Sequence, residues 1–203
     1  MTWEELEQLP DEIAEQIELW DGHPVWLRRG PSEHQAFTGR LWAALERSAR
    51  TEMSAHPERC WRANFETNVF LGNKGKSDFL TPDFLVFQCL AAPYQDVRAA
   101  DVLLVGEILS PSNTKSNIEA KKGRYANAGI PWYWEVQLAS GSSAIDAIRA
   151  YVLELETGRL AEKVRPLRPA NYILAGEWTH SDSEGVDFEF PFPIRIPWTE
   201  LEY

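Results

Sequence analysis

The stretch Pro82-Asp83-Phe84-Leu85-Val86-Phe87, together with Val102-Leu103-Leu104-Val105-Gly106-Glu107-Ile108-Leu109, decides the fold because each apolar run carries one acid. The first run predicts a strand with Asp83 at its mouth. The second is apolar without interruption up to Glu107, which is typical of a strand covered on both faces. A carboxylate in such a strand is costly unless another group pairs with it. We therefore expect Glu107 to have a partner.

A helix is expected to follow the second strand. Ser110-Pro111-Ser112-Asn113 breaks the strand, and Ser116-Asn117-Ile118-Glu119 has the pattern of a capping box that opens a helix. The helix carries Lys121 and Lys122 before Gly129-Ile130-Pro131 ends it. Helix geometry brings both lysines near the inner face without selecting one of them. Either lysine could therefore reach the carboxylates.

The amino-terminal part predicts two helices and a hairpin. Residues 3–8 form a short acidic helix, and Ile13 to Trp20 pairs with Pro24 to Leu27 around an Asp-Gly turn. Glu18 lies in the first of these strands, where it either faces solvent or belongs to a site. A longer helix is expected from Ser32 as its capping residue, with His34 in its first turn.

The other segments complete a mixed sheet. Trp61 to Leu71 is expected to form a hairpin with the strand that begins at Pro82, and Trp132 to Val136 follows the Lys121 helix as a parallel core strand. Ala144 to Leu155 is expected to pair with residues 160–164, and residues 191–197 to dock as an edge segment. We predict an α/β (α+β) fold, a mixed sheet flanked by helices, in one domain that spans residues 1–203.

The composition restricts the class of protein. The chain has 203 residues, a net charge of −11 and nine Trp, which are ordinary for a folded domain except for the Trp content. The net negative charge argues against general electrostatic coating of nucleic acid, since phosphate affinity comes mainly from clustered Lys and Arg. Two cysteines are too few for a disulfide framework, and no apolar run approaches the ~20 residues that span a bilayer. We expect a cytoplasmic protein without a membrane segment.

Two carboxylates and a lysine suggest metal-assisted hydrolysis. Mg²⁺ commonly takes one or two carboxylates and leaves positions for water and substrate phosphate. If the strands of Asp83 and Glu107 are neighbours, the two side chains can share one ion, and a lysine can orient the attacking water or stabilise the phosphate. The alternative is that both lysines extend to solvent while the two acids only bind loop amides at strand ends.

The arrangement resembles the Uma-type family of proposed restriction endonucleases in the PD-(D/E)XK nuclease superfamily. The resemblance is carried by Pro82-Asp83, the segment 100–112 around Glu107, Lys121 with Tyr125, and the segment 128–134, Ala-Gly-Ile-Pro-Trp-Tyr-Trp. Residues 18–22, His34 and residues 190–194 are similar to the ends of the family pattern. The resemblance therefore covers nearly the whole chain.

The resemblance implies a restriction-endonuclease-like core with an added amino-terminal hairpin and carboxy-terminal β segment. It implies that Asp83 and Glu107 bind Mg²⁺, for which Mn²⁺ can substitute, and that Lys121 rather than Lys122 is the catalytic lysine. His34 and Glu18 carry over as accessory residues, with Lys122 as a further candidate. DNA is the implied substrate, and a homodimer is one expectation because superfamily enzymes often work as dimers.

One departure from the family pattern bears on activity. Many members carry an acid where this chain has Asn117, four residues before Lys121. The leading hypothesis is an Mg²⁺-dependent endonuclease that hydrolyses DNA phosphodiester bonds. The alternative, prompted by Asn117 and the charge of −11, is a catalytically weak or inactive nuclease-fold module that serves in binding or interaction.

Overall fold

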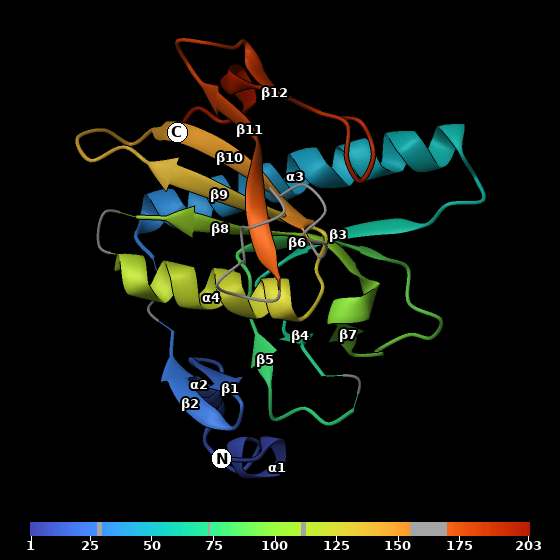
Figure 1. Ribbon diagram of the computed structural model, residues 1–203, viewed down its shortest axis with the longest axis vertical. Coiled ribbons are helices and arrows are strands. Elements are labelled where there is room, and N and C mark those ends of the chain that lie inside the picture. Colours follow the sequence, from blue (N-terminus) through green and yellow to red (C-terminus); the bar gives the residue numbers. More distant parts are fainter. Residues whose placement is uncertain (28–29, 73, 111–112, 155–169) are drawn as a thin grey trace, which may run out of the picture.

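A six-stranded mixed sheet lies at the centre of the molecule (Figure 1). The computed structural model describes residues 1–27, 30–72, 74–110, 113–154 and 170–203. The strand order is β11-β10-β9-β8-β6-β3, in which β8 and β9 are parallel and the other neighbours antiparallel. The bounds are β3 Trp61–Phe65, β6 Phe84–Gln88, β8 Val102–Leu109, β9 Trp132–Leu138, β10 Ile145–Glu154 and β11 Asn171–Thr179. The predicted mixed α/β (α+β) fold and the parallel pair are confirmed.

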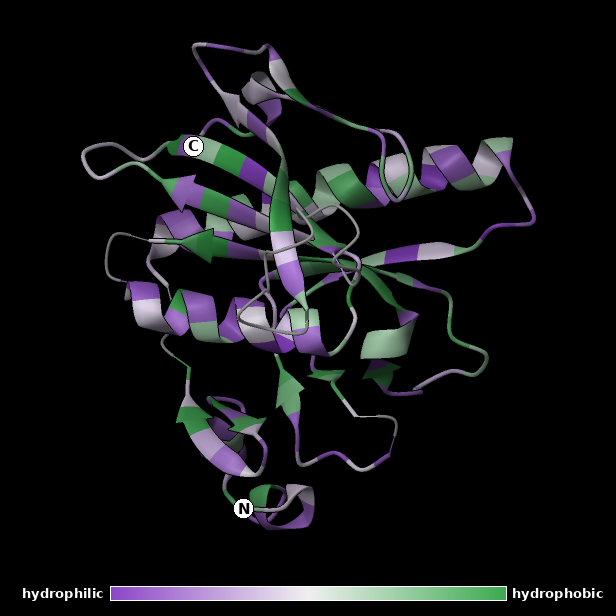
Figure 2. Cartoon of the chain, in the orientation of Figure 1, coloured by the Kyte–Doolittle hydropathy of each residue, from purple (hydrophilic) through white to green (hydrophobic). Residues whose placement is uncertain are grey.

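Helices α3 (Ser32–Ala55) and α4 (Lys115–Asn127) cover opposite faces of this sheet. Side chains alternate between faces along a strand. Phe84 packs in one core cluster with α3, whereas its neighbour Leu85 packs in the other with Tyr125 of α4. In Figure 2 helix α4 is largely purple and white, because its sequence is rich in polar residues, and Tyr125 and Ala126 are its buried residues.

A smaller sheet carries the amino-terminal hairpin. Its order is β2-β1-β5-β4-β7, with β1 Ile17–Trp20, β2 His23–Trp26, β4 Val69–Phe70, β5 Phe79–Leu80 and β7 Val97–Arg98. The hairpin turn is formed by Asp21 and Gly22, both with positive φ, as the Asp-Gly pair predicts. Short helices α1 (Trp3–Leu6) and α2 (Asp11–Ala14) precede it. The prediction that the first strand starts at Ile13 is wrong, because Ile13 lies in α2.

The carboxy-terminal segment forms its own two-stranded sheet. β12 (Gly185–Phe188) pairs antiparallel with β13 (Ile194–Pro197). The expectation of a segment docked on the sheet edge is therefore wrong. Alternate side chains of both strands, including Phe188 and Ile194, are buried in the α3 core cluster, so packing against that face outweighs extension of the main sheet. Short 3₁₀ turns lie at Ala99–Asp101 (η1) and Trp198–Glu200 (η3).

Both helix starts differ from the prediction by one or two residues. Pro31 is the N-cap of α3, so Ser32 lies inside the helix. Thr114 caps α4 by accepting a hydrogen bond from the Asn117 backbone N–H, which replaces the predicted capping box at Ser116. Local hydroxyl and amide side chains offer several competing caps, so a sequence pattern alone does not select one.

Other predictions meet mixed outcomes. The expected partner of the 144–155 strand falls on residues 155–169, outside the described residues, and β10 pairs with β11. Cys60 and Cys89 form a disulfide across the ends of β3 and β6, whereas the sequence led us to expect a cytoplasmic protein. Disulfides are more typical of oxidising compartments. Within the described residues, none of the helices is long and apolar enough to cross a membrane.

Candidate active site

Asp83 and Glu107 lie side by side at one end of the central sheet. β6 and β8 are antiparallel neighbours, and the register pairs Phe84 with Gly106. Asp83 directly precedes β6, so this register sets its carboxylate beside that of Glu107. Gly106 makes the packing possible, because a Cβ there would lie 2.0 Å from the Cζ atom of Phe84. The two acids are therefore adjacent, which is the condition that the metal hypothesis requires.

The structure separates the two lysines of α4. Lys121 Nζ donates to both oxygens of Glu107, at 3.0 and 3.2 Å. Lys122 Nζ instead donates to Glu135 Oε1 at 3.0 Å, on the neighbouring strand β9. Glu107 and Glu135 are paired in the β8–β9 register, so the acid of each strand pairs with a different lysine of α4. Lys121 lies with the predicted acids and Lys122 does not.

Glu18 joins this cluster from the amino-terminal hairpin. Its Oε1 lies 3.1 Å from Lys121 Nζ and accepts a hydrogen bond from the Thr81 backbone N–H at 2.8 Å. Its Oε2 accepts from the Trp20 indole N–H at 2.8 Å. The side chain is fully buried, so the solvent-facing interpretation of Glu18 is wrong.

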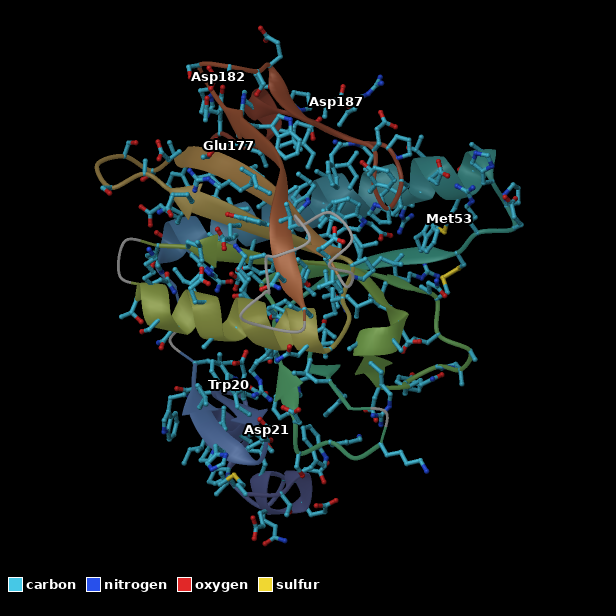
Figure 3. All side chains as sticks on the ribbon, viewed as in Figure 1. Trp20, Asp21, Met53, Glu177, Asp182 and Asp187 are labelled. Atoms are coloured by element: carbon cyan, nitrogen blue, oxygen red, sulfur yellow. A yellow bond between two sulfur atoms is a disulfide. The ribbon has the colours of Figure 1, made fainter. Side chains whose placement is uncertain are left out.

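Arg124 fixes the hairpin against helix α4. Its guanidinium donates to Asp21 at 2.8 Å, pairs with Asp78 and lies over the Trp20 ring at 5.5 Å. Figure 3 labels Trp20 and Asp21 on the hairpin, below α4. Since Arg124 lies one turn of helix after Lys121, the same helix positions the lysine and the hairpin that supplies Glu18.

His34 contacts the other acid. Its Nε2 lies 3.2 Å from Asp83 Oδ2, which also accepts a hydrogen bond from the Ile108 backbone N–H at 2.6 Å. Burial disfavours the charged imidazole, but the hydrogen bond and negative charge of Asp83 outweigh it and raise the pKa of His34. The first turn of α3 thus contributes one side chain to the cluster.

Negative charge exceeds positive charge around Lys121. Burial raises the pKa of Glu107 to about 7, and Asp83 and Glu18 add to the rise while Lys121 and a hydrogen bond from Tyr125 oppose it. Burial also disfavours the charge of Lys121, yet the three surrounding carboxylates outweigh it and raise its pKa. The lysine is therefore charged at neutral pH, and Glu107 lies near its own titration point.

Sequence reasoning did not assign two groups near the site. The Tyr125 hydroxyl donates to Glu107 Oε1 at 2.6 Å and orients that carboxylate. Glu135 forms a second buried pair with Lys122 and accepts a hydrogen bond from the Tyr151 hydroxyl at 3.0 Å. An acid within the apolar segment Tyr133-Trp134-Glu135-Val136 is the same signal that marked Glu107, and it could have identified this pair.

The carboxylates near Lys121 suit a hard divalent cation in their ligand atoms and in their charge. Among the described residues, no group of three or more His, Cys, Asp and Glu side chains is arranged to hold a metal ion. Asp83 and Glu107 can supply two carboxylate ligands, and Mg²⁺ commonly completes its shell with water and substrate oxygens. Three carboxylates around one lysine also leave excess negative charge, which a cation would neutralise.

Comparisons with known proteins bear on this arrangement. Residues 3–180 match the model of the Uma2 family, described as "Putative restriction endonuclease". No curated protein matches the chain. A crystal structure described as that of "a putative nuclease belonging to DUF820 from Anabaena variabilis ATCC 29413" aligns with a TM-score of 0.59 and 16% identity, over 99% of this chain and 97% of that chain. At this identity the alignment shows a shared fold.

Proposed function

Because the chain belongs to the Uma2 family of putative restriction endonucleases, we propose that it hydrolyses DNA phosphodiester bonds as an endonuclease that depends on Mg²⁺ or Mn²⁺. The observation that carries this proposal is the convergence of Asp83, Glu107 and Lys121 at one end of the sheet, with Lys121 Nζ 3.0 Å from Glu107. Asp83 and Glu107 would hold the cation. A bound cation would lower the pKa of a water and offset charge that grows on the phosphate.

Lys121 is the proposed catalytic lysine. Its ammonium is a compact cation that can hold a non-bridging phosphate oxygen or orient the attacking water. Glu18 and Glu107 fix its position, and three nearby carboxylates keep it charged. Because a charged lysine cannot accept a proton, it serves in this proposal as an electrostatic and positioning group rather than as a base.

His34 and Tyr125 are proposed to position the two acids. The Tyr125 hydroxyl fixes Glu107, and the His34 imidazole with the Ile108 N–H fixes Asp83. Mutation of groups that orient metal-binding residues through hydrogen bonds typically costs about 10–100-fold in metal affinity or activity. Lys122 stays outside this proposal because its contact is Glu135.

Incubation with supercoiled plasmid tests the proposal. We expect wild-type protein to nick or linearise the plasmid with Mg²⁺ or Mn²⁺ and to leave it intact in EDTA. Asp83→Asn and Glu107→Gln should abolish cleavage, whereas Asp96→Asn, which changes a partly exposed acid paired with Lys76, should retain it. RNA and nucleotides in the same assay distinguish DNA from other phosphate esters. Absence of metal-dependent cleavage of any DNA form would refute the proposal.

A second candidate function is a nuclease-fold module that binds without cleaving. It is favoured by the internal partners that both acids already have: Lys121 contacts Glu107, and His34 contacts Asp83. Calorimetric titration of Mg²⁺ and Mn²⁺ into wild-type protein and an Asp83→Asn, Glu107→Gln double variant separates the two functions. Binding to wild type alone supports the nuclease, and binding to neither supports the second function.

A further inference from the structure

A second acid with its own lysine and tyrosine lies one strand away from the proposed catalytic cluster. Glu135 of β9 pairs in register with Glu107 of β8. Val105 and Tyr133, the pair two residues earlier, belong to the core cluster on the α4 face of the sheet, so both acids lie on that face too. Neighbouring strands are about 4.8 Å apart. Glu135 is therefore a close neighbour of Glu107, and the proposed function gives it no role.

Glu135 holds the ammonium of Lys122 close to the sheet. Lys122 Nζ lies 3.0 Å from Glu135 Oε1, and the Tyr151 hydroxyl donates to Glu135 Oε2 at 3.0 Å. The ammonium also lies 3.3 Å from the centre of the Tyr151 ring and 5.3 Å from that of Tyr133. The side chains of Lys122 and Glu135 are 14% and 9% exposed. The ion pair is therefore largely enclosed by protein.

The packing of α4 does not by itself decide which acid each lysine meets. Lys121 and Lys122 are consecutive, and their side chains leave the helix about 100° apart. The buried residues of α4 are Tyr125 and Ala126, so the helix presents a narrow apolar surface to the sheet. The ion pairs of the two lysines therefore contribute to the selection, and Glu135 is the contact that takes Lys122.

Glu107 is the neighbouring acid that Lys122 would meet without the charge of Glu135. The flexible four-carbon stem of a lysine can cover the ~4.8 Å between neighbouring strands. Glu107 already accepts hydrogen bonds from Lys121 Nζ at 3.0 and 3.2 Å. A second ammonium at Glu107 would repel a divalent cation and occupy the oxygens that bind it.

We propose that Glu135 is a positioning residue that holds Lys122 away from Glu107. Glu107 then keeps one lysine, Lys121, and its carboxylate stays available to a divalent cation. Tyr151 supports this role by orienting the Glu135 carboxylate. The proposal rests on the proposed function, since the cation at Asp83 and Glu107 is part of that function.

Calorimetric titration of Mg²⁺ into single and double variants tests the proposal. Gln keeps the size of Glu135 and can still accept a hydrogen bond from Tyr151. We expect Glu135→Gln to weaken Mg²⁺ binding about 10–100-fold, the usual effect of residues that support metal ligands. Lys122→Met should not weaken binding, because it removes the competing ammonium. The double variant Lys122→Met, Glu135→Gln should bind Mg²⁺ as wild type does.

This pattern distinguishes positioning from a purely structural role. If the ion pair only stabilised the fold, loss of either partner would act alike, and loss of both would not restore affinity. Asp187→Asn is the control for net charge, because it removes one negative charge from an exposed pair with Arg195 on β12 and β13. It should leave Mg²⁺ affinity unchanged. Equal weakening by Glu135→Gln and Lys122→Met, or weakening that persists in the double variant, would overturn the proposal.

A crystal structure of Glu135→Gln without metal tests the position of Lys122 directly. We expect Lys122 Nζ within hydrogen-bond distance of a Glu107 oxygen. A Lys122 side chain that stays at position 135, or that turns to solvent or to the exposed Glu119, would overturn the proposal.

The two measurements separate this proposal from the proposed function. Lys122 at Glu107 in the variant, in a protein whose wild type binds no divalent cation, would support the placement of Lys122 by Glu135 and refute the metal-dependent nuclease. Equal Mg²⁺ binding by wild type and Glu135→Gln would refute the positioning role and leave the nuclease intact.

Discussion

Replacing Lys121 with Met should destabilise the protein far more than removing a surface lysine does. Met keeps the apolar stem but removes the cation that contacts Glu107 and Glu18, whose side chains are 11% and 0% exposed. Removing one partner of a buried ion pair typically costs about 3–5 kcal/mol, because the other charge stays buried and uncompensated. We expect a loss in this range in the free energy of unfolding at pH 8.

Lys76→Met is the matched control. Lys76 and Asp96 are 2.9 Å apart, as close as the Lys121 pair, but each side chain is 34% exposed. Pairs with such solvent access contribute about 0–1 kcal/mol. Guanidinium denaturation of both variants measures the difference. A Lys121→Met variant that loses no more stability than Lys76→Met would contradict the reasoning that burial makes the Lys121 contacts strong.

Combining Lys121→Met with Glu107→Gln separates the effect of the uncompensated charge on stability from the effect of altered packing. In the double variant Lys121→Met, Glu107→Gln, one of the uncompensated carboxylates becomes neutral. We therefore expect the double variant to be more stable than the sum of the two single losses predicts, with a coupling of about 1–3 kcal/mol. Additive losses would show that the two side chains do not interact in the folded protein.

Three further outcomes are expected. Burial raises the pKa of Glu107 in the folded protein to about 7, above its ordinary value of 4.5, so protonation of this acid favours folding. The free energy of unfolding of wild type relative to that of Glu107→Gln should therefore fall as the pH rises from about 5 to about 8, as measured by urea denaturation. Gly106→Ala should cost about 1–3 kcal/mol in thermal unfolding, because its Cβ would overlap the buried Phe84 ring. Reduction of the Cys60–Cys89 disulfide should lower the free energy of unfolding of wild type by about 2–4 kcal/mol and leave that of Cys60→Ser unchanged. Unfolding measured in the presence and in the absence of dithiothreitol gives the comparison.

Patterns of neighbouring residues predicted most of the fold. The apolar runs beside Asp83 and Glu107 predicted two strands, which the structure places next to each other, and the Asp21-Gly22 pair predicted the hairpin turn. These signals are local, since burial on both faces of a strand and positive φ at a turn restrict the residues at those positions. The carboxy-terminal strands were misplaced because two apolar strands can pair with each other or with a sheet edge, and their packing under α3 decides between these arrangements.

The sequence by itself determined the kind of fold and marked Asp83 and Glu107 as candidate site residues, because lone carboxylates in apolar strands are visible without coordinates. The single domain, the cytoplasmic location and the homodimer stay predictions. Only the tertiary structure decided that Lys121 meets Glu107 while Lys122 meets Glu135, and that Glu18 and His34 join the cluster. The physical reason is that these contacts depend on strand register and helix rotation, which are set by the packing of segments far apart in the chain.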